Sequence, residues 1–363
     1  MPHQPVRLRL ALQLGSFVLL LAGAGGGCDG HNPTLATDPP GDTTSAPVDT
    51  VPETPPDTTQ PPDTVGTPPD TTTPPDTTGT PPDSSGTNPP GTPPTHVGLA
   101  IGEAQQPVTT WAAGDVATVY TAQPESLLAR LEQARRLNLR VYVSLSGSAP
   151  YLRDANGFNI TIWKQRVDRF RRLNFQSYID DGTIAGHFLL DEADDKSNWN
   201  GKIVPVQLVE QMAAYSKSIW PTMPAIIRAF PDYLATYSGT YDHLDGVRVQ
   251  YHARFGDLDK FIKTNVQLSK QLGLIMIGGL NTSRGGGPES GMLAGGPDAP
   301  HPQYYMNAAQ IKAWGKRFLS EPGLCGFILW QYEPAYLARP DIAAAIKELE
   351  QQARGLPNKA CRK

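Results

Sequence analysis

The sequence lacks the short motifs that mark several common enzyme classes. Its seven histidines form neither His-x-His nor His-Glu-x-x-His, which argues against a metal centre. Neither a Gly-x-Ser-x-Gly element nor a phosphate-binding P-loop occurs. There is also no run rich in Lys or Arg, so we expect no nucleic-acid partner. These absences predict a protein without a cofactor, and we expect it to be a monomer.

Residues 29–96 contain no Lys or Arg and almost no hydrophobic residues, whereas 19 Pro and 19 Thr are concentrated there. Such a segment cannot bury enough apolar surface to offset the entropy of ordering it. The motif Pro-Pro-Asp-Thr or Pro-Pro-Asp-Ser recurs along it, and paired prolines together with repelling aspartates extend a chain. We therefore predict a disordered stalk over 29–96 and a folded domain over 97–363. A ligand for a proline-recognition domain is the alternative interpretation of the stalk.

Residues 1–28 have the pattern of an export signal. Arg7 and Arg9 precede an apolar run over 10–22, which is too short for a membrane-spanning helix. The end of this segment, Gly26-Gly-Cys28, resembles the lipobox of bacterial lipoproteins, although Gly25 stands where that family usually has Leu. The resemblance implies lipidation of Cys28 and anchoring to the bacterial cell envelope, at the outer membrane or the cell surface. A plain secretion signal is the alternative.

From residue 97 onward, short apolar runs alternate with amphipathic stretches. Strands are predicted at 97–101, 117–120, 140–145, 184–190, 225–230, 246–251, 274–278 and 326–330. Helices are predicted at 124–137, 160–178, 206–219, 258–272, 308–319 and 342–353, with no long helix between 232 and 245. Eight such strands in this length predict an α/β fold, the (β/α)8 barrel. A doubly wound open sheet is the alternative, but the segment after the first strand is no phosphate-binding glycine loop.

In such a barrel the active site lies at the carboxyl ends of the strands. The polar and aromatic residues expected at this rim are Glu103, Ser146, Asp191, Glu192, Arg228, Gln250, Tyr251, His252, Asn281, Trp330, Tyr332 and Glu333. Aromatic faces suit sugar rings, amides and charges suit hydroxyls, and acids suit proton transfer. We therefore expect a polysaccharide or oligosaccharide substrate. For His252 and Trp330, a structural role is the alternative.

The sharpest feature is an apolar strand that ends in two adjacent acids, Asp191 and Glu192. Strand alternation would point only one of them into the barrel. There, burial beside a second acid would raise the pKa of the carboxyl toward that of a general acid. The alternative is that one of the two acids caps a loop or pairs with Arg228.

These features resemble the (β/α)8 glycoside hydrolases. The strand over 141–147 is similar to strand three of the chitinase-like family 18, Trp330 to its strand-eight tryptophan and Tyr251 to its strand-six tyrosine. That family spaces its acids as Asp-x-Asp-x-Glu, whereas here Asp191 and Glu192 are adjacent. The resemblance implies a glycosidase with Glu192 as general acid.

The partner of that acid stays open. Glu333 or Glu103 would serve as nucleophile or base, with Asp191 tuning Glu192, or the acyl group of the substrate itself would take part. No acid ends strand seven, where Asn281 stands, so a carbohydrate-binding barrel without catalysis is the alternative function. A barrel that serves only as a surface spacer would bind no ligand.

Two cysteines lie within the folded domain. Cys325 opens the last strand at the bottom of the barrel, and Cys361 follows the final helix, which returns to the same end. In an exported protein the two are expected to form a disulfide.

Overall fold

The computed structural model describes residues 94–114, 116–294 and 302–363, all within the unit Thr77–Lys363. The predicted export signal, the lipidation site Cys28 and the stalk up to residue 93 lie outside the described residues. Within the described ranges, no helix is long and apolar enough to cross a membrane.

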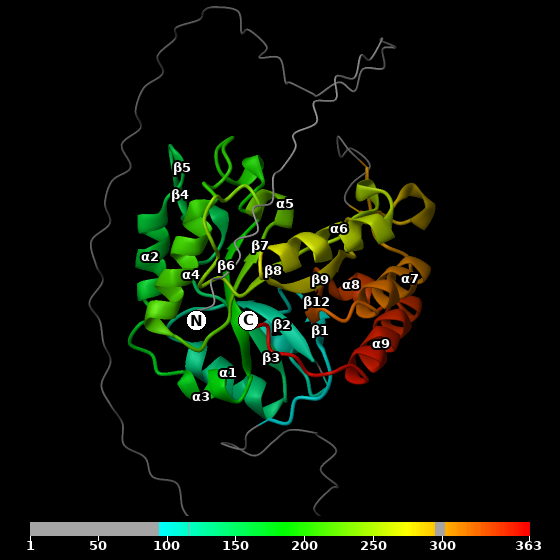
Figure 1. The fold of residues 1–363 in the computed structure, drawn as a ribbon. Helices are drawn as coiled ribbons and strands as arrows, with labels where there is room; N and C mark the ends of the chain where they lie inside the picture. Colours follow the sequence, from blue (N-terminus) through cyan, green and yellow to red (C-terminus); the bar gives the residue numbers. More distant parts are fainter. Residues whose placement is uncertain (1–93, 115, 295–301) are drawn as a thin grey trace, which may run out of the picture. The chain divides into compact units, whose positions relative to one another are not determined.

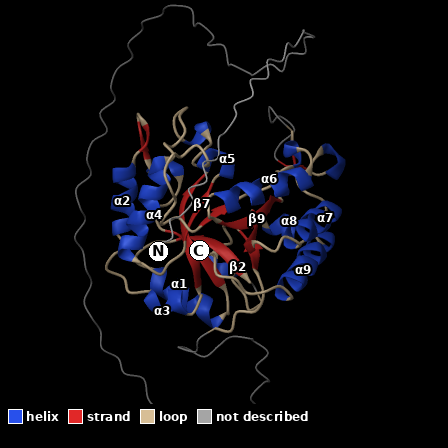
Figure 2. Cartoon of the chain, in the orientation of Figure 1, coloured by secondary structure: helices blue, strands red, loops and turns tan. Residues whose placement is uncertain are grey.

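The described chain forms one sheet of eight parallel strands surrounded by helices (Figures 1 and 2). Around the sheet the order is β1, β12, β9, β8, β7, β6, β3 and β2, which is the order of a barrel. The strands are β1 Ala100–Glu103, β2 Ala117–Thr121, β3 Arg140–Ser144, β6 Ile184–Asp191, β7 Ala225–Arg228, β8 Gly246–Arg248, β9 Ile275–Asn281 and β12 Leu324–Trp330. The predicted (β/α)8 fold is confirmed.

Between β1 and β2 the barrel closes without a full ladder of backbone hydrogen bonds. A single parallel bridge joins Ala104 to Val119, and the Thr118 hydroxyl donates to the Glu103 carbonyl at 2.8 Å. At Gly102 the strands approach so closely that an added Cβ would lie 1.7 Å from the Ala117 carbonyl oxygen. Glycine is therefore required where the seam forms.

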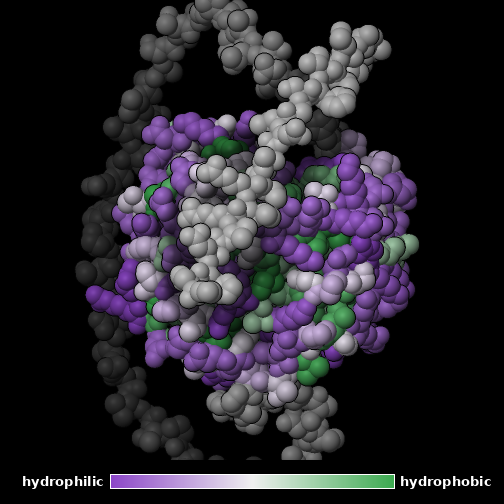
Figure 3. All heavy atoms as spheres, in the orientation of Figure 1, coloured by the Kyte–Doolittle hydropathy of each residue, from purple (hydrophilic) through white to green (hydrophobic). Residues whose placement is uncertain are grey.

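The helices lie on the outside of the barrel (Figure 2). They are α1 Leu127–Arg136, α2 Ile160–Asp168, α3 Gln176–Asp180, α4 Gln207–Ile219, α5 Pro231–Leu234, α6 Leu258–Gln271, α7 Ala308–Leu319, α8 Pro334–Leu337 and α9 Pro340–Arg354. Two short hairpins pair β4 Arg153–Asp154 with β5 Gly157–Phe158, and β10 Leu293–Ala294 with β11 Gln303–Tyr304. Hydrophilic side chains cover most of the described face in Figure 3, as expected for an outer helical layer.

One predicted helix is corrected. The segment 160–178 forms two helices, α2 and α3, rather than one. The Asn174 side chain accepts a hydrogen bond from the Gln176 backbone at 3.2 Å, a local turn that competes with a continuous helix. The expected lack of a long helix after β7 is confirmed, because α5 has only four residues.

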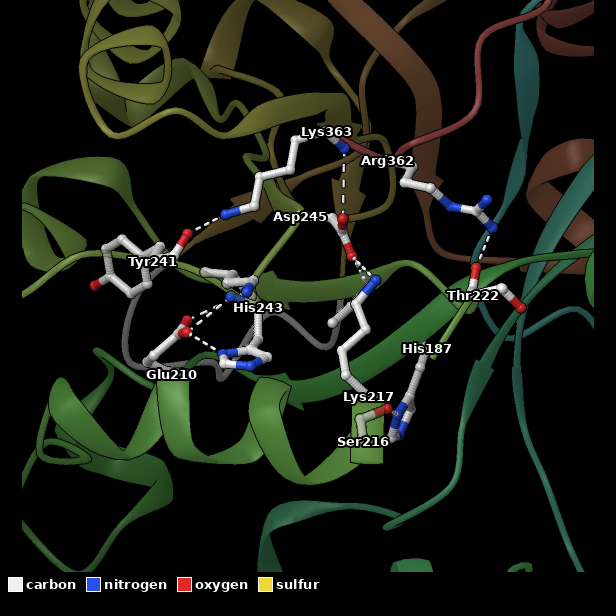
Figure 4. Close-up of polar contacts among 12 residues, drawn as sticks. His187, Glu210, Ser216, Lys217, Thr222, Tyr241, His243, Asp245, Arg362 and Lys363 are labelled. Atoms are coloured by element: carbon white, nitrogen blue, oxygen red, sulfur yellow. Dashed lines mark hydrogen bonds and ion pairs between the residues drawn. The ribbon is translucent and has the colours of Figure 1, made fainter. Parts of the chain in front are cut away.

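The bottom of the barrel is fastened by the C-terminal segment. Cys325 at the start of β12 and Cys361 form a disulfide, the pair expected from the sequence. Lys363 donates to Asp245 and to the Tyr241 carbonyl, and Lys217 of α4 forms a 2.6 Å ion pair with Asp245 (Figure 4). The end of the chain thus closes the pole of the barrel opposite the carboxyl ends of the strands.

Candidate active site at the carboxyl ends of the strands

Glu192, which directly follows β6, lines three cavities at the barrel mouth. Their volumes are about 400, 200 and 700 Å³. Residues that line two of the three are Asp195, Arg228, Arg248, His252, Arg254 and Trp330. These side chains follow different strands, so barrel closure brings together residues that are distant in the sequence.

Both adjacent acids pair with one arginine at the end of β7. Arg228 Nη1 lies 2.7 Å from Glu192 Oε1 and 3.1 Å from Asp191 Oδ1. The second Glu192 oxygen, Oε2, accepts from Asn198 Nδ2 at 3.0 Å. Both oxygens of Glu192 therefore accept hydrogen bonds from donors that favour a carboxylate. This ion pair with Arg228 is the alternative that the sequence analysis left open for the two acids.

An irregularity in β6 explains how both acids reach the same side chain. The pairing of β6 with β7 shifts register between Phe188 and Asp191. Regular alternation would have sent the two acids to opposite faces, and the bulge removes that alternation. Glu192 itself has a φ of +49°, in the left-handed region. The Trp199 indole donates to the Glu192 carbonyl at 2.8 Å and holds this conformation.

Asp194 is a site residue that is not among the rim residues predicted from the sequence. It lines the 400 Å³ cavity together with Glu192. Burial raises the pKa of its carboxyl above the usual range, although the Phe230 backbone donates to Oδ2 at 2.9 Å. The site thus holds two carboxyl groups in different environments, one fixed by a cation and one partly buried. The Glu-x-Asp spacing directly after the strand is the sequence feature that could have identified Asp194.

His252 and Asn281 meet at the mouth from β8 and β9. Asn281 Nδ2 lies 3.2 Å from His252 Nε2, and Asn281 Oδ1 accepts from the Arg284 backbone at 3.0 Å. Burial and the nearby Arg254 and Arg228 lower the pKa of His252 to about 3. The imidazole is therefore neutral at pH 7 and presents Nε2 to the amide as an acceptor.

The Trp330 side chain is half-buried at the end of β12 and lines two of the cavities. The Arg228 guanidinium lies 5.8 Å from its ring centroid. An aromatic face beside charged donors is a surface on which a sugar ring can stack. Among the described residues, no group of three or more His, Cys, Asp or Glu side chains is arranged to hold a metal ion.

Tyr251, expected to contact substrate, lies elsewhere. It is 3% exposed and packs against Phe261 of α6 and Trp314 of α7, with ring centroids 5.1 and 5.2 Å away. Its hydroxyl donates to the Gly256 carbonyl. The side chain points to the helical layer because alternation along β8 and the extended residues that follow it sends Arg248 and Gln250 inward and their neighbours outward.

Four other expected site residues do not line the three cavities. Ser146 is fully buried and donates to the Leu189 carbonyl at 3.3 Å. The Glu333 carboxylate accepts from the Tyr305 hydroxyl at 2.5 Å, at the start of α8. Tyr332 donates through its backbone to Ala104 at 2.9 Å, and the Glu103 carbonyl takes part in the seam between β1 and β2. Neither Glu333 nor Glu103 therefore shares one of these three cavities with Glu192.

No family model matches the chain, and no curated protein matches it. Solved structures that it resembles include CbXyn10B in its native form, with 12% identity over 67% of this chain and 88% of that one, at a TM-score of 0.45. A GH18 chitinase from Pseudoalteromonas aurantia has 12% identity over 70% and 98%, at 0.42. TsXylA, an intracellular xylanase from Thermoanaerobacterium saccharolyticum, has 14% identity over 69% and 95%, at 0.45. These neighbours are glycoside hydrolases, and likenesses this distant show the fold alone.

Proposed function

We propose that this protein is a glycoside hydrolase that cleaves a polysaccharide or oligosaccharide at the mouth of its barrel. The observation that carries the proposal is the position of Glu192, which lines all three cavities and is fixed by Arg228 and Asn198. A tryptophan, an amide and a second carboxyl group surround the same space. This combination can bind a sugar and supply both acids that glycoside hydrolysis needs.

The contacts favour a division of roles that differs from the expectation that Glu192 is the general acid. Each Glu192 oxygen already accepts from one donor, Arg228 or Asn198, an arrangement that positions Glu192 as an acceptor. Asp194 has the raised pKa that a proton donor requires. We assign Asp194 as the donor to the glycosidic oxygen. The Glu192 carboxylate then either attacks the anomeric carbon or takes a proton from the attacking water.

Hydrolysis of substrates with different leaving groups tests this assignment. We expect Glu192→Gln to abolish hydrolysis of both a polysaccharide and an aryl glycoside. Asp194→Asn should lose the polysaccharide activity but keep activity on an aryl glycoside, whose acidic phenol leaves without protonation. Glu348→Gln, a half-exposed acid of α9 that pairs with Lys312 and Lys316, serves as the control. Unchanged hydrolysis in both Glu192→Gln and Asp194→Asn would overturn the proposal.

A second function, carbohydrate binding without catalysis, is favoured by a specific observation. β9 ends at Asn281, whose amide is already bonded to His252, so no carboxylate approaches the mouth from that strand. Such a barrel would bind glycans by calorimetry and release no reducing ends. Release of reducing ends that depends on Glu192 separates the two functions.

We further propose that the chain is exported and lipid-anchored through Cys28. The support is the leader sequence alone, with its basic start, short apolar run and small residues before the cysteine. In a bacterial host, a clickable fatty-acid analogue should label the wild-type chain and not Cys28→Ser. Equal labelling of both chains would contradict the anchor.

A further inference from the structure

Arg248 at the end of β8 is a buried cation in the described part of the barrel that forms no ion pair there. It is 2% exposed and lines both the 400 and the 200 Å³ cavities beside Glu192. Its Nη2 donates to Gln250 Oε1 at 2.9 Å, and its Nε has no hydrogen-bond partner. A buried guanidinium with an unmade hydrogen bond is costly unless a further acceptor arrives.

Gln250, two residues beyond the end of β8, is a second buried side chain with an unused donor. The side chain is 3% exposed, lines the 400 Å³ cavity, and its Nε2 has no hydrogen-bond partner. Because Gln250 Oε1 accepts from Arg248, the two side chains form one hydrogen-bonded unit. This unit has two unused donors, the Arg248 Nε and the Gln250 Nε2, on residues that line one cavity.

The carboxylates nearest to this unit are already engaged. Asp191 and Glu192 both bond to Arg228, and Arg228 and Arg248 are paired across the β7–β8 ladder. Burial and the neighbouring Arg228 lower the pKa of Arg248 to about 9, and Asp191 and Glu192 compensate only in part. An additional anion at this place would stabilise the charged form of Arg248.

The rim above carries further positive charge. Arg254 and Arg284 are exposed and, among the described residues, form no ion pair. With Arg228 they line the 700 Å³ cavity, where the carboxylates among the described lining residues are Glu192 and Asp195. A cationic rim attracts a polyanion along its length.

We propose that the substrate is an acidic glycan and that Arg248 and Gln250 bind the carboxylate of one of its uronic acid units. The planar guanidinium fork matches a carboxylate, and the amide adds a donor beside it. Arg254 and Arg284 then bind neighbouring carboxylates of the same chain. That the glycan is a substrate rests on the proposed function, whereas its binding at this site does not require hydrolysis.

Calorimetric titration of the full chain tests the inference. The ligands are oligogalacturonate and oligoglucuronate, the same oligosaccharides after reduction of their carboxyl groups to neutral alcohols, and a sulfated galactan. We expect at least one uronate to bind about tenfold or more tightly than its reduced form, because a hydrogen bond to a charged group has about this effect. Added salt should weaken uronate binding. Equal affinity for charged and reduced ligands, or binding of the sulfated galactan alone, would overturn the inference.

Variants locate the site. Arg248→Gln should weaken uronate binding by about tenfold or more and leave the reduced ligand unaffected. The matched control is Arg140→Gln, another buried arginine, which lies at the opposite pole of the barrel and is bonded to Gly98 and Asn358. If Arg248→Gln does not fold, the test uses other variants. These are Gln250→Leu and the double variant of two exposed residues, Arg254→Gln with Arg284→Gln, and they should also weaken uronate binding. Uronate binding that is unchanged in all of these variants would also overturn the inference.

The outcome of these binding experiments can be distinguished from the outcome of the hydrolysis test of the proposed function. Uronate binding without bond cleavage supports the anionic site and contradicts the hydrolase. Hydrolysis of neutral glycans without preference for uronates supports the hydrolase and contradicts the anionic site.

Discussion

Arg228 at the end of β7 binds both acids that end β6, with Nη1 3.1 Å from Asp191 Oδ1 and 2.7 Å from Glu192 Oε1. Its side chain is 11% exposed, whereas those of Asp191 and Glu192 are 53% and 38% exposed. The cation is therefore the buried partner, and the two carboxylates reach it from the solvent side. This relationship converts two adjacent acids into a positioned pair at the mouth of the barrel.

Replacing the cation separates its positioning role from its contribution to stability. Arg228→Met should lower kcat about tenfold or more, because Glu192 loses the donor that fixes it. The free energy of unfolding should fall by only about 1 kcal/mol, since the released carboxylates can be hydrated. Urea unfolding and kcat measure the two effects. A large loss of stability with unchanged kcat would mean that the ion pair is structural.

Tyr251 and Trp330 provide a test of which aromatic residue contacts sugar. Tyr251→Phe removes a hydroxyl that donates to Gly256, so we expect a loss of about 1 kcal/mol in stability and unchanged KM. Trp330→Ala should raise KM severalfold, because its ring lines two of the cavities. A raised KM in Tyr251→Phe would contradict the packing found for that ring.

The disulfide should stabilise the folded chain by restricting the unfolded one. Cys325 and Cys361 are separated by 36 residues. Closing a loop of this length contributes about 4 kcal/mol in the chain-entropy description. We expect Cys325→Ser with Cys361→Ser to lower the free energy of unfolding by about this amount, with little change in kcat, because the bond lies at the opposite pole from the cavities. Measurement under reducing conditions provides the matched control.

His187 predicts sensitivity to acid. It is fully buried beside Trp163, its Nδ1 lies 2.8 Å from the Ser216 hydroxyl (Figure 4), and burial lowers its pKa from 6.5 to about 3. The unfolded chain takes up a proton near pH 6.5, whereas the folded chain does not. The stability this gives is complete above pH 6.5 and is lost as the pH falls toward 3.

At pH 5 the loss from His187 alone should be about 2 kcal/mol relative to pH 7. Guanidinium unfolding at pH 5 and 7 measures it, and His187→Gln should show a smaller difference between the two pH values. The pKa values of His252 and His96 are lowered to about 3 and 4, so these residues also reduce stability in acid, and they do so in the wild type and in His187→Gln alike. An equal pH dependence in His187→Gln would remove His187 as its source.

Several parts of the fold followed from local pattern. Apolar runs between amphipathic stretches predicted the strands and most helices, because burial on both faces of a parallel strand leaves a continuous apolar signature. The split between α2 and α3 was missed because a hydrogen bond from one backbone amide to Asn174 decided it. Of the residues predicted at the rim, Glu192, Arg228, His252 and Trp330 line common cavities, and their role in binding a substrate stays a prediction.

The sequence by itself determined that a barrel begins near residue 97, and that polar residues gather at one end of its strands. Only the tertiary structure decided which side chains enter the cavities. A register shift in β6 brought Asp191 and Glu192 to one arginine. Alternation along β8 and the residues after it turned Tyr251 outward and placed Arg248 and Gln250 inside. The physical reason is that strand phase and bulges depend on pairing with neighbouring strands, which local sequence does not specify.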